Sequence, residues 1–439
     1  MPSRKRLLGD TSWVFAGQLA SALGTLVGLR LVTEVVPPAV YGAVVLAIGI
    51  VGLAQGFAVS PLMQTVLRFY PEYARGTEEA VLRWTIVDEL RKPVLWLCVI
   101  LLLALGAWSH YVLDGFALGP LCAGLFLVEV VRSVEVTFLN ASQKQRAMAL
   151  FVSADAWLRP VAAVAAVWLL GVDTGSVVAG YIAGAVLSLA GFYGLTRATG
   201  VRRSHTSRQS DDKADRKRLW AYAKPLVFLP LVGWIIGQSD RYIVGGLAGL
   251  ELAGIYAAFY GLASRPFLMF TSGVELAVRQ VYYAEVTAGN CIGERRVFWL
   301  WLASVAGAAL LLLLVIVLLH QELATLLLAA QYRAHSALMI WVAMGYVLAS
   351  CTQVIERICY ALHDTRGVLL IATGGAVSSV VIALPMVHYF GIDGAAWAVP
   401  IYFGLQLVLA SWRARFARQR SASKAALTDS VQLAGAQDV

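Results

Sequence analysis

Charged side chains interrupt several long apolar segments of this sequence, and in such surroundings they can bind ions or charged molecules. Glu129, Arg132 and Glu135 follow one another at intervals of three residues, which places them on one face of a helix. Asp155 and Arg159 are four residues apart with the acid first, the order that favours an ion pair within a helix. Because an ionised group at membrane depth is costly, we expect each of these side chains to face a partner or a water-filled cavity.

Further ionisable residues occur in the other apolar segments, in both halves of the chain. They are Arg30, Glu34, Asp240, Arg241, Arg265, Glu275, Glu356 and Arg357. Asp240 and Arg241 are adjacent in sequence, so they point to different faces of a helix and cannot simply neutralise each other.

Two interpretations of these charges remain open. In the first, arginines form a cationic surface inside the membrane that binds an anionic group such as phosphate, because the planar guanidinium binds phosphate through paired hydrogen bonds. Arg30 and Arg132 are the better candidates for this role. In the second, the charges are internal ion pairs that hold helices in register, and Asp155 with Arg159 fits this second interpretation best.

The composition is that of a membrane protein. Of the 439 residues, 59% are hydrophobic and 14% are charged, whereas soluble domains average about 45–50% apolar and about 25% charged residues. The mean hydropathy is +0.72, and apolar runs of about 20 residues, the length of a membrane span, recur along the whole chain. A soluble enzyme, a disordered protein and an outer-membrane barrel are thereby excluded.

The apolar runs predict about twelve transmembrane helices. Their limits are 11–36, 39–66, 93–113, 116–139, 149–171, 174–196, 222–248, 252–278, 297–319, 335–358, 367–390 and 394–412. With both termini in the cytoplasm, every basic residue between the spans except Arg333 falls on the cytoplasmic side, as the positive-inside rule requires. The net charge of +9 is therefore a sign of topology, and nucleic-acid binding is not expected.

The spans fall into two halves. We predict an N-terminal six-helix lobe (1–196), a basic cytoplasmic linker (197–221), a C-terminal six-helix lobe (222–412) and a disordered cytoplasmic tail (413–439). Landmarks recur in the two halves at nearly constant spacing: Arg30, Gly42 and Arg68 match Arg241, Gly254 and Arg279. Such tandem repeats are common in transporters.

No motif for covalent, metal or nucleotide chemistry accompanies these spans. The five cysteines form no C-x-x-C pair, the six histidines are not paired, and no Walker motif is present. We therefore predict no catalytic residue, no metal site and no cofactor.

Three stretches resemble the bacterial polysaccharide (O-antigen type) flippases, the polysaccharide-transport branch of the MOP exporter superfamily. The first runs from Gly17-Gln18 through Arg30 and Tyr41-Gly42 to Leu67–Tyr73. The second is Gln238–Ile243 followed by Ala253–Tyr256, and the third is Phe138–Ala141. The resemblance implies an all-α fold of two lobes around a cationic cavity in the bacterial inner membrane.

The resemblance also implies a function. An undecaprenyl-diphosphate-linked oligosaccharide would be moved to the outer leaflet by alternating access, without ATP and near a polysaccharide polymerase machinery. Arg30, Arg132, Arg241 and Arg265 would contact the diphosphate or an acidic sugar. Arg159 and the acids of the apolar segments would couple transport to a proton or sodium ion or would form charge pairs. These acids are Glu129, Glu135, Asp155, Asp240, Glu275 and Glu356.

Two alternatives to a flippase stay open. A drug exporter of the MATE type from the same superfamily would favour acidic groups around a cationic cargo. A membrane enzyme that polymerises or ligates glycans would need a sizeable outer loop, and the longest one here spans only about residues 320–334. We expect a transporter rather than an enzyme.

Overall fold

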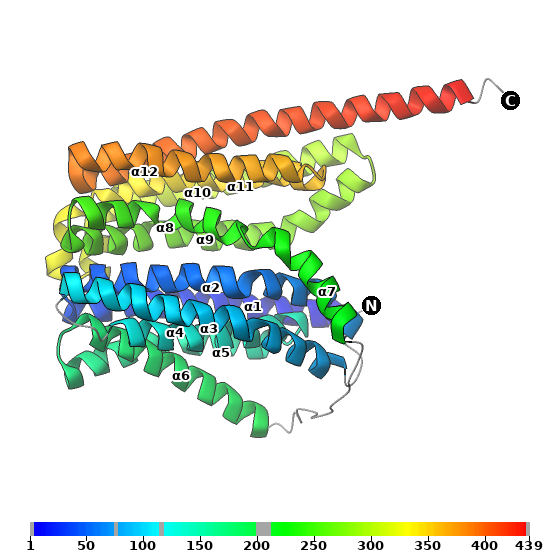
Figure 1. Ribbon diagram of the computed structural model, residues 1–439. Helices are drawn as coiled ribbons and strands as arrows, with labels where there is room; N and C mark the ends of the chain where they lie inside the picture. The colour runs from blue at the N-terminus through cyan, green and yellow to red at the C-terminus, as the bar shows by residue number, and fades with distance from the viewer. Residues whose placement is uncertain (1–3, 74–77, 114–117, 199–211, 436–439) are drawn as a thin grey trace. The chain divides into compact units, whose positions relative to one another are not determined.

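The computed structural model describes residues 4–73, 78–113, 118–198 and 212–435, and all regular structure in these ranges is helical (Figure 1). The helices are α1 (Arg4–Val35), α2 (Pro38–Tyr73), α3 (Glu78–Leu113), α4 (Leu118–Ala141), α5 (Gln145–Leu170), α6 (Thr174–Ala198), α7 (Asp212–Ala223), α8 (Leu229–Leu247), α9 (Leu250–Thr287), α10 (Cys291–Leu327), α11 (Leu338–Ala361) and α12 (Thr365–Gly435). Two 3₁₀ turns, η1 (Lys224–Leu226) and η2 (Ala330–His335), join them. The predicted all-α fold is confirmed.

Each predicted span falls on one or two of these helices. The last two spans share α12, which changes direction at Gly391, where φ is 60° and ψ is −138°, a conformation open to glycine. Within the described ranges, eight helices are long and apolar enough to cross a membrane. The total of twelve crossings stays a prediction.

The described residues divide into two compact units. The first consists of the residues up to Trp234 together with Gly249–Ile255 and Thr325–Arg333. In it α5 packs against α1 and α6, and α4 packs against α2, α3 and α6. The second unit consists of Ile235–Ala248, Tyr256–Ala324 and the residues from Ala334 onward, and in it α11 packs against α12.

The predicted linker and tail are largely helical where the structure describes them. Residues 199–211 lie outside the described part, whereas 212–223 form α7, which packs against α2 in the first unit. Arg216 of α7 forms ion pairs with Asp88 at 2.8 Å and Glu89 at 3.0 Å, and Leu219 is buried. The helical course of α12 through Gly435 differs from the disorder expected for the tail, whose alanine, lysine and leucine residues favour a helix.

Gly42 of α2 and Gly254 of α9 let two backbones meet inside the first unit. A Cβ atom at Gly42 would collide with the carbonyl oxygen of Leu250, and one at Gly254 would collide with that of Pro38. The contact is reciprocal, since each carbonyl belongs to the residue four positions before the opposite glycine. Gly42 and Gly254 are also matching landmarks of the sequence repeat.

Alanine at Gly42 is expected to destabilise the protein by about 1–3 kcal/mol, because the added methyl group overpacks this contact. Gly52→Ala, in the same helix, is the matched control, since no atom lies within 4 Å of a Cβ at that position. The control should raise stability by about 0.5–1 kcal/mol through helix propensity. Thermal unfolding in detergent measures both changes, and a Gly42→Ala protein as stable as the control would contradict the prediction.

Asp364 joins the start of α12 to its later part, within the second unit. Its Oδ1 accepts a hydrogen bond from Nη2 of Arg413 at 2.9 Å and one from the Gly367 N–H at 3.2 Å, and its Oδ2 lies 2.8 Å from Nε of Arg413. Burial alone raises the pKa of Asp364, but the hydrogen bonds from Arg413 and Gly367 outweigh it and leave the pKa lowered.

Because the pKa of Asp364 is lower in the folded protein than in the unfolded chain, the ionised carboxylate stabilises the fold, and acid removes this stabilisation. The contribution of Asp364 is present above the unfolded pKa, about 3.9, and is lost as the pH falls through the folded value. Asp364→Asn should therefore be less stable than the wild type at pH 7, and the difference should shrink towards pH 3. Unfolding temperatures of both proteins across this range test it; a constant difference would be evidence against it.

Candidate functional site

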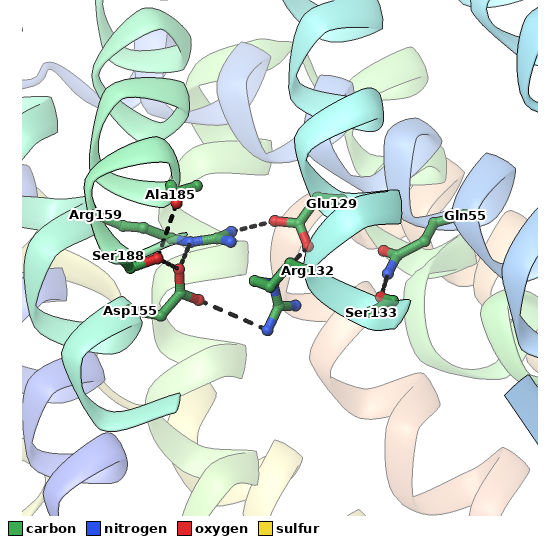
Figure 2. Close-up of polar contacts among 8 residues, drawn as sticks. All are labelled: Gln55, Glu129, Arg132, Ser133, Asp155, Arg159, Ala185 and Ser188. Atoms are coloured by element: carbon green, nitrogen blue, oxygen red, sulfur yellow. Dashed lines mark hydrogen bonds and ion pairs between the residues drawn. The ribbon is translucent and has the colours of Figure 1, made fainter. Parts of the chain in front are cut away.

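Four charged side chains from α4 and α5 form one network in the first unit (Figure 2). Glu129 accepts a hydrogen bond from Nε of Arg132 at 2.9 Å and another, on its second oxygen, from Nη1 of Arg159. Asp155 Oδ1 accepts hydrogen bonds from Nε of Arg159 at 2.8 Å and from the Ser188 hydroxyl of α6 at 3.0 Å. Nη1 of Arg132 lies 3.7 Å from Oδ2 of Asp155. The two clusters that the sequence predicts separately are therefore one cluster.

Close helix packing brings the third helix into the network. A Cβ atom at Gly180 or Gly184 of α6 would collide with the backbone of α5 at Ala163 and Arg159. These glycines let α6 approach α5, and Ser188 follows one turn later on the same helix, where it reaches Asp155.

The network is electrically balanced. Glu129 and Asp155 are both 7% exposed, and two guanidinium groups offset their two carboxylates. A single buried charge would carry a large desolvation cost, which a paired and hydrogen-bonded set largely offsets. The arrangement is that of the internal ion pairs of the second interpretation. The roles of these residues in anion binding or ion coupling stay predictions.

Glu135, the third charged residue of α4, has partners of its own. It forms an ion pair with Arg83 of α3 and accepts a hydrogen bond from the Tyr193 hydroxyl of α6 at 2.6 Å. Sequence reasoning missed Arg83, because α3 begins well before its predicted apolar span. A side-chain hydrogen bond between Gln55 of α2 and Ser133 of α4 lies beside the network (Figure 2).

In the second unit, Asp240 and Arg241 of α8 have separate environments, as their adjacency predicts. Asp240 is 1% exposed and accepts a hydrogen bond from the Tyr256 hydroxyl at 2.7 Å and one from the Arg241 backbone N–H at 2.8 Å. The Arg241 guanidinium instead donates to Gln238 and lies over the Tyr260 ring, 4.6 Å from its centroid.

Arg241 differs from the arginines of the network in its counter-charge. Across the ranges that the structure describes, no carboxylate lies within ion-pair distance of its guanidinium, the adjacent Asp240 being bonded to its backbone N–H instead, and its buried Nε has no hydrogen-bond partner there. A guanidinium that is desolvated without a carboxylate partner is costly to place in a membrane-spanning helix.

The remaining predicted residues have diverse surroundings. Glu275 pairs with Arg279 at 3.0 Å and with Arg357 at 3.2 Å, while Glu356 is partly buried and in no ion pair within the described residues. Arg30 pairs with Glu34 at 2.8 Å, and Arg265 is exposed on α9. Arg30 and Arg132 belong to the first unit, Arg241 and Arg265 to the second. That all four line one cationic cavity stays a prediction.

A protein-family model decides to which family this chain belongs. The model, described as "Polysaccharide biosynthesis protein", matches residues 7–278, more than half of the chain. The chain is a member of this polysaccharide biosynthesis family. The match runs from α1 into α9, so it includes both the α4–α5 network and Asp240 with Arg241. Among curated proteins, no sequence matches the chain.

Solved structures share the fold of this polysaccharide biosynthesis family member. An inward-facing multidrug resistance MATE transporter of the MOP superfamily has a TM-score of 0.69 at 15% identity, over 92% of this chain and 95% of the other. The lipid II flippase MurJ, inward closed, has a TM-score of 0.63 at 14% identity, over 92% and 87%. A MOP superfamily transporter from Pyrococcus furiosus, described by the reverse polarity of its binding pocket, has a TM-score of 0.55 at 15% identity, over 92% and 94%.

These likenesses identify the fold as that of the MOP superfamily, and the predicted fold class is confirmed. Together with the eight long apolar helices of the described residues, they make this polysaccharide biosynthesis family member a multi-pass membrane protein.

Proposed function

We propose that this protein moves an undecaprenyl-diphosphate-linked oligosaccharide from the cytoplasmic to the outer leaflet of the bacterial inner membrane, for cell-surface polysaccharide synthesis. Membership of the polysaccharide biosynthesis family supports a role in that pathway. The fold, shared with the lipid II flippase MurJ, supports transport of a lipid-linked substrate.

The observation that carries the proposal is the Arg241 guanidinium, which forms no ion pair with a carboxylate in the described part of the chain, the adjacent Asp240 being bonded to its backbone N–H instead. A cation held in a membrane helix without an ion-pair partner is suited to accept an anion from outside the chain. A diphosphate fits this role, since a guanidinium binds phosphate oxygens through paired hydrogen bonds. Arg30, Arg132 and Arg265 are the further candidates for contacts to the diphosphate or to an acidic sugar.

The transport cycle that we propose is driven without ATP. Alternating access shields the polar glycan while its lipid tail stays in the bilayer. The membrane potential, worth about 2.3 kcal/mol per charge per 100 mV, or a proton or sodium gradient supplies the work. Both termini are then cytoplasmic, and a polysaccharide polymerase acts on the product at the outer face.

Drug export of the MATE type is the second candidate, since a MATE transporter has a TM-score of 0.69 to this chain. A cationic drug would need unpaired acids. Glu129, Glu135, Asp155 and Glu275 are each paired with an arginine. Of the other two acids, Asp240 accepts a hydrogen bond from the Tyr256 hydroxyl and Glu356 forms no ion pair within the described residues, while Arg241 forms none either. These charges favour an anionic cargo.

A reconstituted assay separates the two functions. Liposomes with purified protein receive a labelled undecaprenyl-diphosphate oligosaccharide, and a membrane-impermeant reagent measures how much glycan changes leaflet. We expect movement that needs an imposed potential or ion gradient. Movement of a cationic dye in place of the glycan would overturn the flippase proposal in favour of drug export.

A further inference from the structure

A shallow hollow lies on the first turns of α10, in the second unit. Its volume is about 790 Å³, and its lining combines apolar side chains with two adjacent cations. We call four of the lining residues the α10 patch: Arg295, Arg296, Trp299 and Leu300. Both arginines are exposed, and Trp299 and Leu300 are 56% and 62% exposed. The patch therefore presents charge and uncovered apolar surface side by side.

The opposite face of α10 holds the helix in its unit. Phe298, Trp301 and Val305 are buried in an apolar cluster that includes residues of α11 and α12. Glu294, in the same turn as the two arginines of the patch, instead forms an ion pair with Arg418 of α12 at 3.1 Å. These contacts fix the helix, so the α10 patch is the face that remains after the helix has packed.

The two cations of the patch have no counter-charge of their own. Across the described residues, no carboxylate forms an ion pair with Arg295 or Arg296, and the acid next to them in sequence, Glu294, is paired with Arg418. Two adjacent positive charges therefore remain at the protein surface. A surface of this charge is complementary to an anion.

The position of the patch on α10 points to the membrane. Of the eight apolar helices found in the described ranges, α10 has the highest hydropathy, and little of its most apolar part is buried. Arg295 and Arg296 directly precede its predicted span, 297–319, at the end that the predicted topology places on the cytoplasmic side. Trp412 of α12, 56% exposed, stands at the matching end of the span 394–412. Exposed tryptophans on both helices are typical of the membrane–water interface.

The order of the patch residues along the helix matches an amphiphile. Residues four apart are neighbours on a helix surface, so Trp299 lies one turn beyond Arg295, and Leu300 one turn beyond Arg296. Each cation at the predicted membrane surface thus has an exposed apolar side chain one turn deeper. A molecule with an anionic head and an apolar tail would contact both, whereas a soluble anion would leave the apolar side chains uncovered.

We propose that the α10 patch binds an anionic phospholipid, with phosphatidylglycerol as the type. The guanidinium groups of Arg295 and Arg296 bind the phosphate, and Trp299 and Leu300 lie against the glycerol and the first part of the acyl chains. Basic residues next to a membrane span attract anionic lipids in this way. The site is separate from the α4–α5 network and from Asp240 with Arg241, and it requires no transport of a cargo.

Fluorescence of Trp299 tests the site in bilayers. The full-length protein is reconstituted in phosphatidylcholine with increasing fractions of brominated phosphatidylglycerol, whose bromine atoms quench a tryptophan that contacts the lipid. The difference between the wild type and Trp299→Phe isolates the emission of Trp299. We expect half-quenching at a lipid fraction about 5- to 30-fold lower than brominated phosphatidylcholine requires, since each basic residue near an anionic lipid contributes a factor of about five.

Two double variants show whether the arginines cause the preference. With glutamine at both Arg295 and Arg296, the two brominated lipids should quench Trp299 at equal fractions. Glutamine at both Arg68 and Arg91 is the matched control, because it removes the same charge from two exposed arginines outside the patch. Each of these lies near a carboxylate of its own helix, at 3.9 and 3.7 Å. The control should show the preference of the wild type.

Several results would overturn this inference. One is equal quenching of Trp299 by both brominated lipids in the wild type, and another is a preference that survives glutamine at both Arg295 and Arg296. Quenching by neither lipid would mean that protein, such as a second copy of this chain, covers the patch. Displacement of the lipid by inorganic phosphate, but not by chloride at equal ionic strength, would identify a site for soluble anions instead. The flippase proposal is independent of each result, because the assay measures no transport.

Discussion

Replacing Arg159 with leucine is expected to lower the free energy of unfolding by about 3–5 kcal/mol, the range found when one partner of a buried ion pair is removed. The Arg159 guanidinium lies between two carboxylates, donating to Glu129 through Nη1 and to Asp155 through Nε at 2.8 Å. Without it, Arg132 alone faces two carboxylates that are each 7% exposed. Unfolding of purified protein in detergent measures the loss.

Two further variants show whether the loss comes from charge. Leucine at both Asp155 and Arg159 leaves one acid and one arginine, so the double variant should recover most of the stability that the single one loses. Ser188 retains a partner there, since its hydroxyl also lies 2.9 Å from the Ala185 carbonyl oxygen and can donate its single hydrogen to it. Arg91→Ala, at an arginine side chain 80% exposed, is the control and should change stability by about 0–1 kcal/mol. A double variant less stable than Arg159→Leu would contradict the explanation.

Local spacing in the sequence predicted the pairs within a helix and not those between helices. The intervals Glu129–Arg132 and Asp155–Arg159 correspond to contacts of 2.9 and 2.8 Å, because residues three or four apart share a helix face. The contact of Arg159 with Glu129 depends on the rotation and register of two helices. The rotation and register of the two helices depend on the packing of many side chains, so the spacing of the residues within either pair does not reveal them.

The ends of the helices could be predicted from the sequence only where they coincide with the edges of the apolar, membrane-spanning segments. Hydropathy located the apolar part of α3 at 93–113, but the helix begins at Glu78 with a stretch that carries Arg83, Asp88 and Glu89. A helix can continue outside the hydrocarbon core of the bilayer, where charged residues are tolerated. Apolar composition therefore locates the membrane-spanning part of a helix and not the full length of the helix. Partners such as Arg83, which binds Glu135, lie in these extensions and were missed for that reason.

Replacing Arg241 with alanine is expected to reduce transport of the lipid-linked glycan by about 10- to 100-fold. Hydrogen bonds to charged groups contribute about 1.5–3 kcal/mol each, and about 1.4 kcal/mol corresponds to a factor of ten. Arg241→Lys keeps the charge but not the planar fork, so it should recover only part of the activity. Complementation of a flippase-deficient strain, with accumulated lipid-linked glycan quantified and membrane levels checked, measures both; Arg366→Ala, at an exposed arginine, is the control.

Stability should respond to Arg241 in a different way from Arg159, and this contrast tests the assignment. Arg159 forms ion pairs with two acids, whereas no carboxylate of the described residues lies within ion-pair distance of Arg241, and the buried Asp240 beside it is attracted only at longer range. Asp240 keeps its hydrogen bonds from the Tyr256 hydroxyl and the backbone. Arg241→Ala should therefore lose less stability than Arg159→Leu while it loses transport. Normal transport by this variant, or a loss of stability as large as that of Arg159→Leu, would mean that Arg241 serves the fold rather than an anionic cargo.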